Sequence, residues 1–193
     1  MRWREGWSLR LPPLMRGGKR AIAAAACVAL IGGTAACGEE KHTHVVEGEP
    51  LELGDFLIKV QITRFLNPSL PDDREYLEGQ PAPPTGKDYL GVFMEIDNEG
   101  DEAVRLPTAE EIEVVDTTDA HYSPIESDSP FALPLGEAIE PGGEVPAVDT
   151  AASSGPIQGS FVLFLVDESV SENRPLELEL EADGAKGTVE LDI

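Results

Sequence analysis

Cysteine is almost absent from this chain. The 193 residues contain two, Cys27 and Cys37, and both lie near the N-terminus. The sequence beyond Cys37 therefore offers no thiol for a disulfide, a metal ion or a nucleophile. A domain formed by that part of the chain has to be stable through packing alone.

Basic residues are also scarce, and most of the acidic surplus follows the N-terminal segment. The whole chain has 14 Lys and Arg against 37 Asp and Glu; residues 1–36 hold six of the former and one of the latter. The remainder carries 8 basic and 36 acidic residues, a net charge of −28. Such a surface repels nucleic acid and anionic headgroups and attracts cationic partners, although solubility alone also accounts for it. We exclude nucleic acid as a partner.

No apolar run is long enough to span a bilayer, which takes about 20 strongly apolar residues. Residues 21–36 (AIAAAACVALIGGTAA) are shorter and rich in Ala and Gly, and they follow the basic segment 16–20 (RGGKR). A basic start, a short apolar core and small residues at the end are typical of a secretory signal. We predict a signal peptide over residues 1–36, with Met15 as an alternative start.

The end of that segment, Thr34-Ala35-Ala36-Cys37, resembles the lipobox of bacterial lipoproteins, with Thr34 where Leu is usual. The resemblance implies a diacylglyceryl group on Cys37 and cleavage before it. Two acyl chains would hold the protein stably on the membrane. We expect a chain anchored on the extracytoplasmic face of the cell membrane; a plain secretory signal is the alternative.

The mature chain lacks any sustained helical stripe of apolar residues and shows the two-residue period of strands instead. Phe56, Ile58 and Val60 alternate with Leu57 and Lys59, and Leu176, Leu178 and Leu180 alternate with glutamates. About seven to eight such strands, separated by turn signals, predict an all-β fold, an Ig-like antiparallel β-sandwich over residues 51–193. Residues 37–50 would form a polar tether, reaching roughly 40 Å when extended.

Four features resemble a family of Ig-like domains in bacterial lipoproteins, akin to the secreted immunoprotective antigens of actinobacteria. They are a first strand ending in a variable loop, residues 89–98 with the turn 98–101 (NEGD), residues 139–143 (IEPGG) and residues 159–166. The resemblance covers nearly the whole mature domain. It implies an Ig-like sandwich outside the membrane, and it implies no catalytic residue.

The loop at residues 67–87 contains five prolines and is longer than ordinary connections. We interpret it as a stiff, solvated excursion and as one candidate contact surface.

Catalytic patterns are missing from the sequence. The predicted domain contains a single histidine, His121, in or beside a turn, and Ser153-Ser154-Gly155 is no nucleophile elbow. We expect no enzymatic activity.

Two weak metal patterns remain. His42 and His44, flanked by glutamates, offer imidazole and carboxylate ligands for Zn(II) or Cu(II), although ordering a tether opposes binding. Asp97, Glu99 and Asp101 alternate as at the start of a Ca(II) loop, but the rest of that motif is out of register. We favour a plain tether for the first and a hairpin turn for the second.

The C-terminal strands predict an acidic surface. If they pair through the turn at Asp183-Gly184, five carboxylates project from one outward face: Glu177, Glu179, Glu181, Glu190 and Asp192. Like charges opposed across strands destabilise a sheet. Protection against edge-to-edge aggregation is the ordinary reason for such a face, and a docking surface for a cation or a basic partner is the more specific one.

Together these patterns predict a lipid-anchored binding or scaffolding module of the cell envelope, with an envelope protein as partner. The alternative is a metal-binding or metal-delivery lipoprotein that uses His42 and His44.

Overall fold

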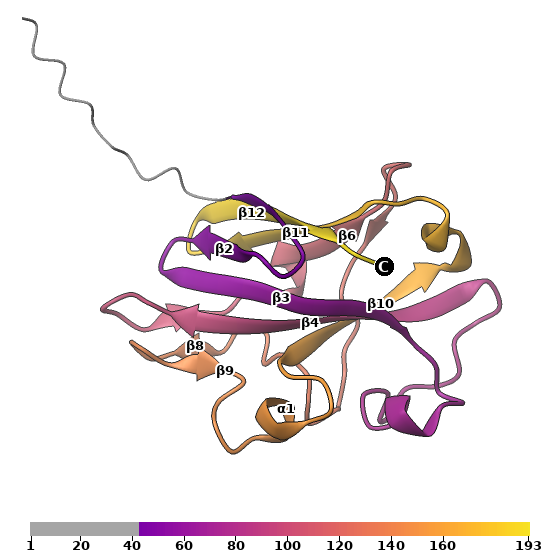
Figure 1. Cartoon of the computed structure of the whole chain (residues 1–193), viewed down its shortest axis with the longest axis horizontal. Coiled ribbons are helices and arrows are strands. Elements are labelled where there is room, and N and C mark those ends of the chain that lie inside the picture. The colour runs from indigo at the N-terminus through magenta and orange to yellow at the C-terminus, as the bar shows by residue number, and fades with distance from the viewer. Residues whose placement is uncertain (1–42) are drawn as a thin grey trace, which may run out of the picture. The chain divides into compact units, whose positions relative to one another are not determined.

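The structure, a computed structural model, describes residues 43–193, which form two facing five-stranded sheets (Figure 1). One has the strand order β1-β12-β11-β6-β7; the other has β10-β4-β3-β2, with β9 also paired to β4. The predicted all-β, mainly antiparallel sandwich is confirmed. The strands of this region are β1 His44–Val46, β2 Pro50–Leu53, β3 Phe56–Leu66, β4 Lys87–Asn98, β5 Val104–Arg105, β6 Ile112–Val115, β7 His121–Tyr122, β8 Ala138–Ile139, β9 Glu144–Val145, β10 Ser160–Asp167, β11 Leu176–Ala182 and β12 Ala185–Leu191.

Helical structure in the described region is limited to short turns. They are the α-helix α1 Ala151–Ser154 and the 3-10 turns η1 Pro71–Asp73, η2 Ala109–Glu111 and η3 Glu168–Ser171. No helix within residues 43–193 has the length and apolar character needed to cross a membrane.

The main core lies between the two sheets and follows the alternation in the sequence. On β11 the leucines are buried, and Leu178 lies opposite Val189 of β12 and Val114 of β6. Ile58 of β3 and Ile96 of β4, which are paired in register, close the core from the second sheet. Apolar burial between the sheets is therefore the main stabilising contribution.

A second core lies on the other face of β4 and β10, beneath the proline-rich loop. Tyr76 of that loop is 2% exposed and packs against Phe93, Phe131 and Phe161, with ring centroids 4.9–5.7 Å apart. The buried Asp73 carboxylate pairs with Arg64 and accepts a 2.8 Å hydrogen bond from the backbone N–H of Asn67. Most of the loop is exposed, but the prediction of a solvated excursion is wrong for Asp73, Tyr76 and Leu77, because Tyr76 and Leu77 close a hydrophobic cluster.

β10 lies at the end of its sheet, although most of its residues are buried. It is the last strand in its sheet order, and it is buried because residues 124–133 run along its free edge. Two backbone bonds of 2.8 Å hold this cover, from Ile125 N–H to the carbonyl of Leu163 and from Leu133 N–H to that of Phe161.

Asn98 joins the two turn motifs noted in the sequence. Its Nδ2 donates 2.9 Å hydrogen bonds to the carbonyls of Glu102 and Ile139, and its Oδ1 accepts a 3.0 Å bond from Gly100 N–H. Its backbone N–H also donates to the carbonyl of Gly143. Residues 98–101 form a turn as predicted but not a hairpin, because β5 pairs with β8 rather than with β4.

The folded domain begins earlier than predicted. His44–Val46 form β1, which pairs in parallel with β12, and Val45 is 4% exposed within the main core. The prediction of a tether extending to residue 50 is therefore wrong for this stretch, since one apolar side chain and a neighbouring strand edge order it. Residues 37–42, including Cys37 and His42, lie outside the described region.

Candidate functional site

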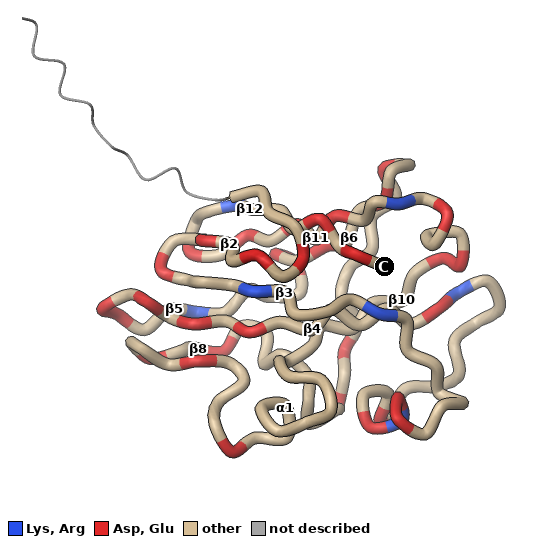
Figure 2. The backbone as a smooth tube through the Cα atoms, in the orientation of Figure 1, with Lys and Arg blue, Asp and Glu red and all other residues tan. Residues whose placement is uncertain are grey.

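The outward side of the β12-β11-β6 sheet brings the predicted carboxylates together. We define the acidic face as Glu113, Glu177, Glu179, Glu181, Glu190 and Asp192. Glu177 lies directly opposite Glu190, and Glu179 lies directly opposite Glu113. Glu113 was not predicted to belong to it, although it alternates with the buried Ile112 and Val114. Figure 2 shows the acidic positions along β11 and toward the C-terminus.

A hollow of about 380 Å³ opens on this face between β12, β11 and η2. Its lining includes five glutamates and one lysine: Glu110, Glu111, Glu113, Glu179, Glu181 and Lys186. The remaining lining is uncharged and consists of Thr43, Ile112, Leu180, Gly187 and Thr188. The hollow therefore has a strong surplus of negative charge.

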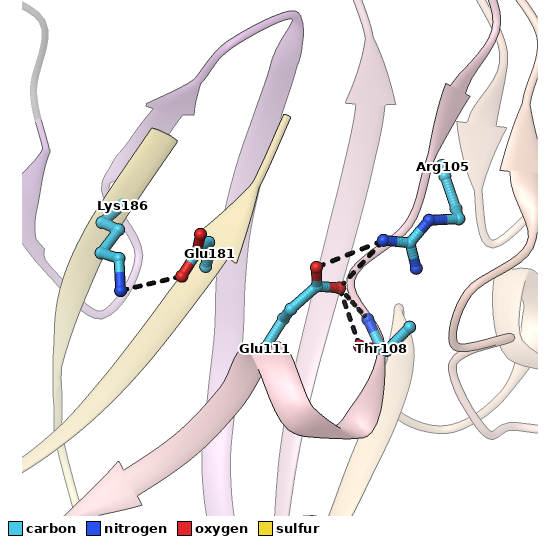
Figure 3. A network of polar contacts seen from close by, with 5 residues as sticks. All are labelled: Arg105, Thr108, Glu111, Glu181 and Lys186. Atoms are coloured by element: carbon cyan, nitrogen blue, oxygen red, sulfur yellow. Dashed lines mark hydrogen bonds and ion pairs between the residues drawn. The ribbon is translucent and has the colours of Figure 1, made fainter. Parts of the chain in front are cut away.

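The basic groups near the hollow are already paired (Figure 3). Lys186 Nζ lies 2.8 Å from Glu181 Oε2, and this contact raises the pKa of Lys186. Arg105 lies 3.2 Å from Glu111, whose carboxylate also accepts 2.8 Å bonds from the N–H and the hydroxyl of Thr108. These bonds, led by the backbone N–H of Thr108, lower the pKa of Glu111.

His121 of β7 borders the acidic face. Its Nδ1 lies 2.9 Å from Glu113 Oε2, and its Nε2 lies 3.6 Å from Asp119 Oδ1. The hydrogen bond with Glu113 is the main reason that the pKa of His121 is raised, and the charges of Asp119 and Glu179 add to it. The protonated imidazolium is thus the form that these carboxylates favour.

Glu177, Glu179 and Glu190 form no ion pair with any Lys, Arg or His of residues 43–193. Lys186 and His121 therefore leave part of the acidic face uncompensated. That part can attract a cationic group from outside.

Of the two predicted metal ligands, the structure describes one, His44. His44 is exposed on β1, opposite Thr188, while His42 lies outside the described region. No group of three or more His, Cys, Asp or Glu in residues 43–193 is arranged to hold a metal ion. The Zn(II) or Cu(II) site at His42 and His44 stays a prediction, as do the lipid on Cys37 and the absence of catalysis.

Comparisons with known proteins found similarity only to solved structures. No protein-family model and no curated protein matches the chain. Among solved structures, it is similar to an uncharacterized β-sandwich protein of Clostridium difficile 630, with 18% identity and a TM-score of 0.48 over 80% of this chain and 97% of that one. It is also similar to the yjhA protein of Bacillus subtilis (12% identity, TM-score 0.47, 77% of this chain and 99% of that one).

A third structure of similar shape is ycdA of Bacillus subtilis, described as a candidate lipoprotein. It shares 13% identity and a TM-score of 0.48 over 76% of this chain and 38% of that one.

Proposed function

We propose that this protein is a lipid-anchored binding module on the extracytoplasmic face of the cell membrane, and that its acidic face contacts a cationic envelope protein. The observation that carries the proposal is the register of the sheet, which sets Glu177 against Glu190 and Glu179 against Glu113. As part of this proposal, the domain is related to the secreted immunoprotective antigens of actinobacteria.

The register matters because it opposes folding. Like charges directly opposite on adjacent strands destabilise a sheet, by about 0.2–1 kcal/mol per pair. Scattered surface charges would give the same solubility without that cost. Two such pairs beside one hollow are best explained by a partner that supplies the missing positive charge.

The chemistry of the partner follows from the charge. A cationic protein surface would be steered toward the face at low ionic strength, since exposed charges interact over about 10 Å at 0.1 M salt. Lysine or arginine side chains fit the hollow better than apolar ones, because five of its eleven lining residues are glutamates.

Cross-linking followed by a binding measurement tests the proposal. A photoreactive side chain replacing Thr188, which lines the hollow, should capture an envelope protein, and the same group replacing Glu172, the exposed residue after η3, should not. The captured protein is then purified and titrated against the chain.

Glu177→Gln combined with Glu179→Gln should weaken that complex several-fold at low salt, mainly by slowing association. Glu168→Gln with Glu172→Gln, on and beside η3, removes the same charge elsewhere and should change little. An equal effect of both pairs would mean that net charge, rather than the acidic face, attracts the partner.

A further inference from the structure

We propose a second binding site, unrelated to the acidic face: an apolar groove that takes an apolar side chain from a basic segment of a partner protein. The groove encloses about 750 Å³ between β8, β9, the loop into α1 and the start of β10. This volume lies in the range of about 300–1,000 Å³ that is typical of ligand pockets. In Figure 1, β8, β9 and α1 occupy the side of the domain away from β12.

The lining of the groove is mainly apolar. It includes Leu106, Ala132, Pro134, Ile139, Val145 and Pro146. Ser160, 2% exposed, adds a hydroxyl that can donate or accept one hydrogen bond. An apolar site with few polar groups is the usual form of a binding pocket.

The walls are held by a side-chain hydrogen bond and by strand pairing, so the groove exists before a partner arrives. Asn98 fixes the turn from Ile139 to Gly143 through its bond to the Ile139 carbonyl, and Gly142 adopts a positive φ of 68°. On the next wall, Val145 of β9 pairs with Ile96 of β4. Such preorganisation lowers the entropic cost of binding.

One rim of the groove carries an apolar side chain that faces water. Val148 is 71% exposed, the highest fraction among the exposed large apolar side chains of residues 43–193. Ala147 beside it is exposed as well. A partner that entered the groove would cover both and remove their apolar surface from water.

The charge around the groove identifies the occupant. Its charged lining residues are Glu137, Glu140 and Glu144, all exposed, and none of them pairs with a Lys, Arg or His of the described domain. No basic residue is among the lining. An apolar group flanked by positive charges therefore complements the site.

The same charge excludes other occupants. A second copy of this chain would bring its own net charge of −28 beyond residue 36, and anionic headgroups would likewise be repelled. The groove shares no lining residue with the hollow on the acidic face. The two sites can therefore be tested separately.

Three fluorescein-labelled hexapeptides provide the probes for the full-length chain: Lys-Lys-Leu-Leu-Lys-Lys, Lys-Lys-Ser-Ser-Lys-Lys and Glu-Glu-Leu-Leu-Glu-Glu. Fluorescence anisotropy measures each Kd at low salt. We expect the first peptide to bind at least about tenfold more tightly than either other peptide, because only it offers both apolar burial and charge complementarity.

Variants then locate the binding. Ala147→Trp should block the groove and Val148→Ser should weaken binding, and both positions are exposed enough for the fold to survive, which thermal unfolding verifies. Glu140→Gln with Glu144→Gln should weaken the leucine peptide several-fold. Glu177→Gln with Glu179→Gln, on the acidic face, should leave the preference for leucine over serine unchanged.

Equal binding of the leucine and serine peptides would overturn the proposal, because charge alone would then explain the interaction. Failure of all three peptides to bind would overturn it as well. So would undiminished binding to a folded Ala147→Trp variant. None of these results would bear on the acidic face, whose test uses a different partner and different variants.

Discussion

Replacing Asn98 by alanine should destabilise the domain more than any exposed polar substitution. The side chain is 1% exposed and makes three hydrogen bonds of 2.9, 2.9 and 3.0 Å, to the carbonyls of Glu102 and Ile139 and from Gly100 N–H. A net contribution of about 1 kcal/mol per bond gives a loss of about 3 kcal/mol. The buried Ile139 would add to the cost, because its carbonyl loses a partner where water has little access.

Urea unfolding measures this loss as the change in the free energy of unfolding. Asn67→Ala is the matched control: the Asn67 Oδ1 accepts one 2.9 Å bond from Ser69 N–H at an exposed site, so about 0.5–1 kcal/mol is expected. A loss for Asn98→Ala no larger than that of the control would refute the claim that the Asn98 side chain holds the two turns together.

Asn98→Asp sharpens the argument, because it changes one atom and keeps the shape. The acceptor for Gly100 N–H survives, but an oxygen replaces the donor to the carbonyls of Glu102 and Ile139. An ionised carboxylate facing two carbonyl oxygens should cost more than alanine does at neutral pH. Part of the loss should return on acidification, when the new carboxyl group can donate.

The other predictions concern the acidic face and the anchor. The imidazole of His121 should titrate with a midpoint above 6.5 by NMR, and Glu113→Gln should lower its pKa. The contribution of His121 to the stability of the fold is complete below about pH 6.5 and disappears as the pH rises through the raised pKa. A free energy of unfolding that grows over that range would contradict this. Glu177→Gln should raise the free energy of unfolding by about 0.2–1 kcal/mol by relieving the contact with Glu190, whereas Glu168→Gln should not. Cys37→Ala should abolish lipid labelling and release the protein from membranes, and labelling that persists would disprove the lipobox assignment.

The regular alternation of β11 and β12 allowed both their pairing and their outward carboxylates to be predicted from sequence. Leu176, Leu178 and Leu180 fix which side of β11 is buried, and a two-residue period leaves no freedom for the glutamates between them. The partner strand on the other side was not predictable, because the register of β6 against β11 is set by long-range pairing. Glu113 and His121 were therefore missed as neighbours of Glu179.

The proline-rich loop was misinterpreted for a related reason. Tyr76 and Leu77 stand among polar residues and prolines, so no local period marks them as buried. Their burial depends on Phe93, Phe131 and Phe161, which three separate stretches of the chain provide. Asp73, which would be costly to bury alone, is compensated by Arg64 from β3. Such contacts exist only after the chain has folded.

The short strand β1 changes how the proposed anchor and the acidic face relate. Six residues, Cys37 to His42, separate the proposed lipid from Thr43, so Thr43 can lie at most about 20 Å from a lipid on Cys37. Thr43 itself lines the hollow, and its carbonyl accepts a 2.9 Å bond from Thr188 N–H of β12. If Cys37 is acylated, one side of the hollow stays within that reach of the bilayer. Anionic headgroups would repel the acidic face only where it comes within about 10 Å of the bilayer. A cationic partner lying there would relieve both that repulsion and the repulsion between the opposed glutamates.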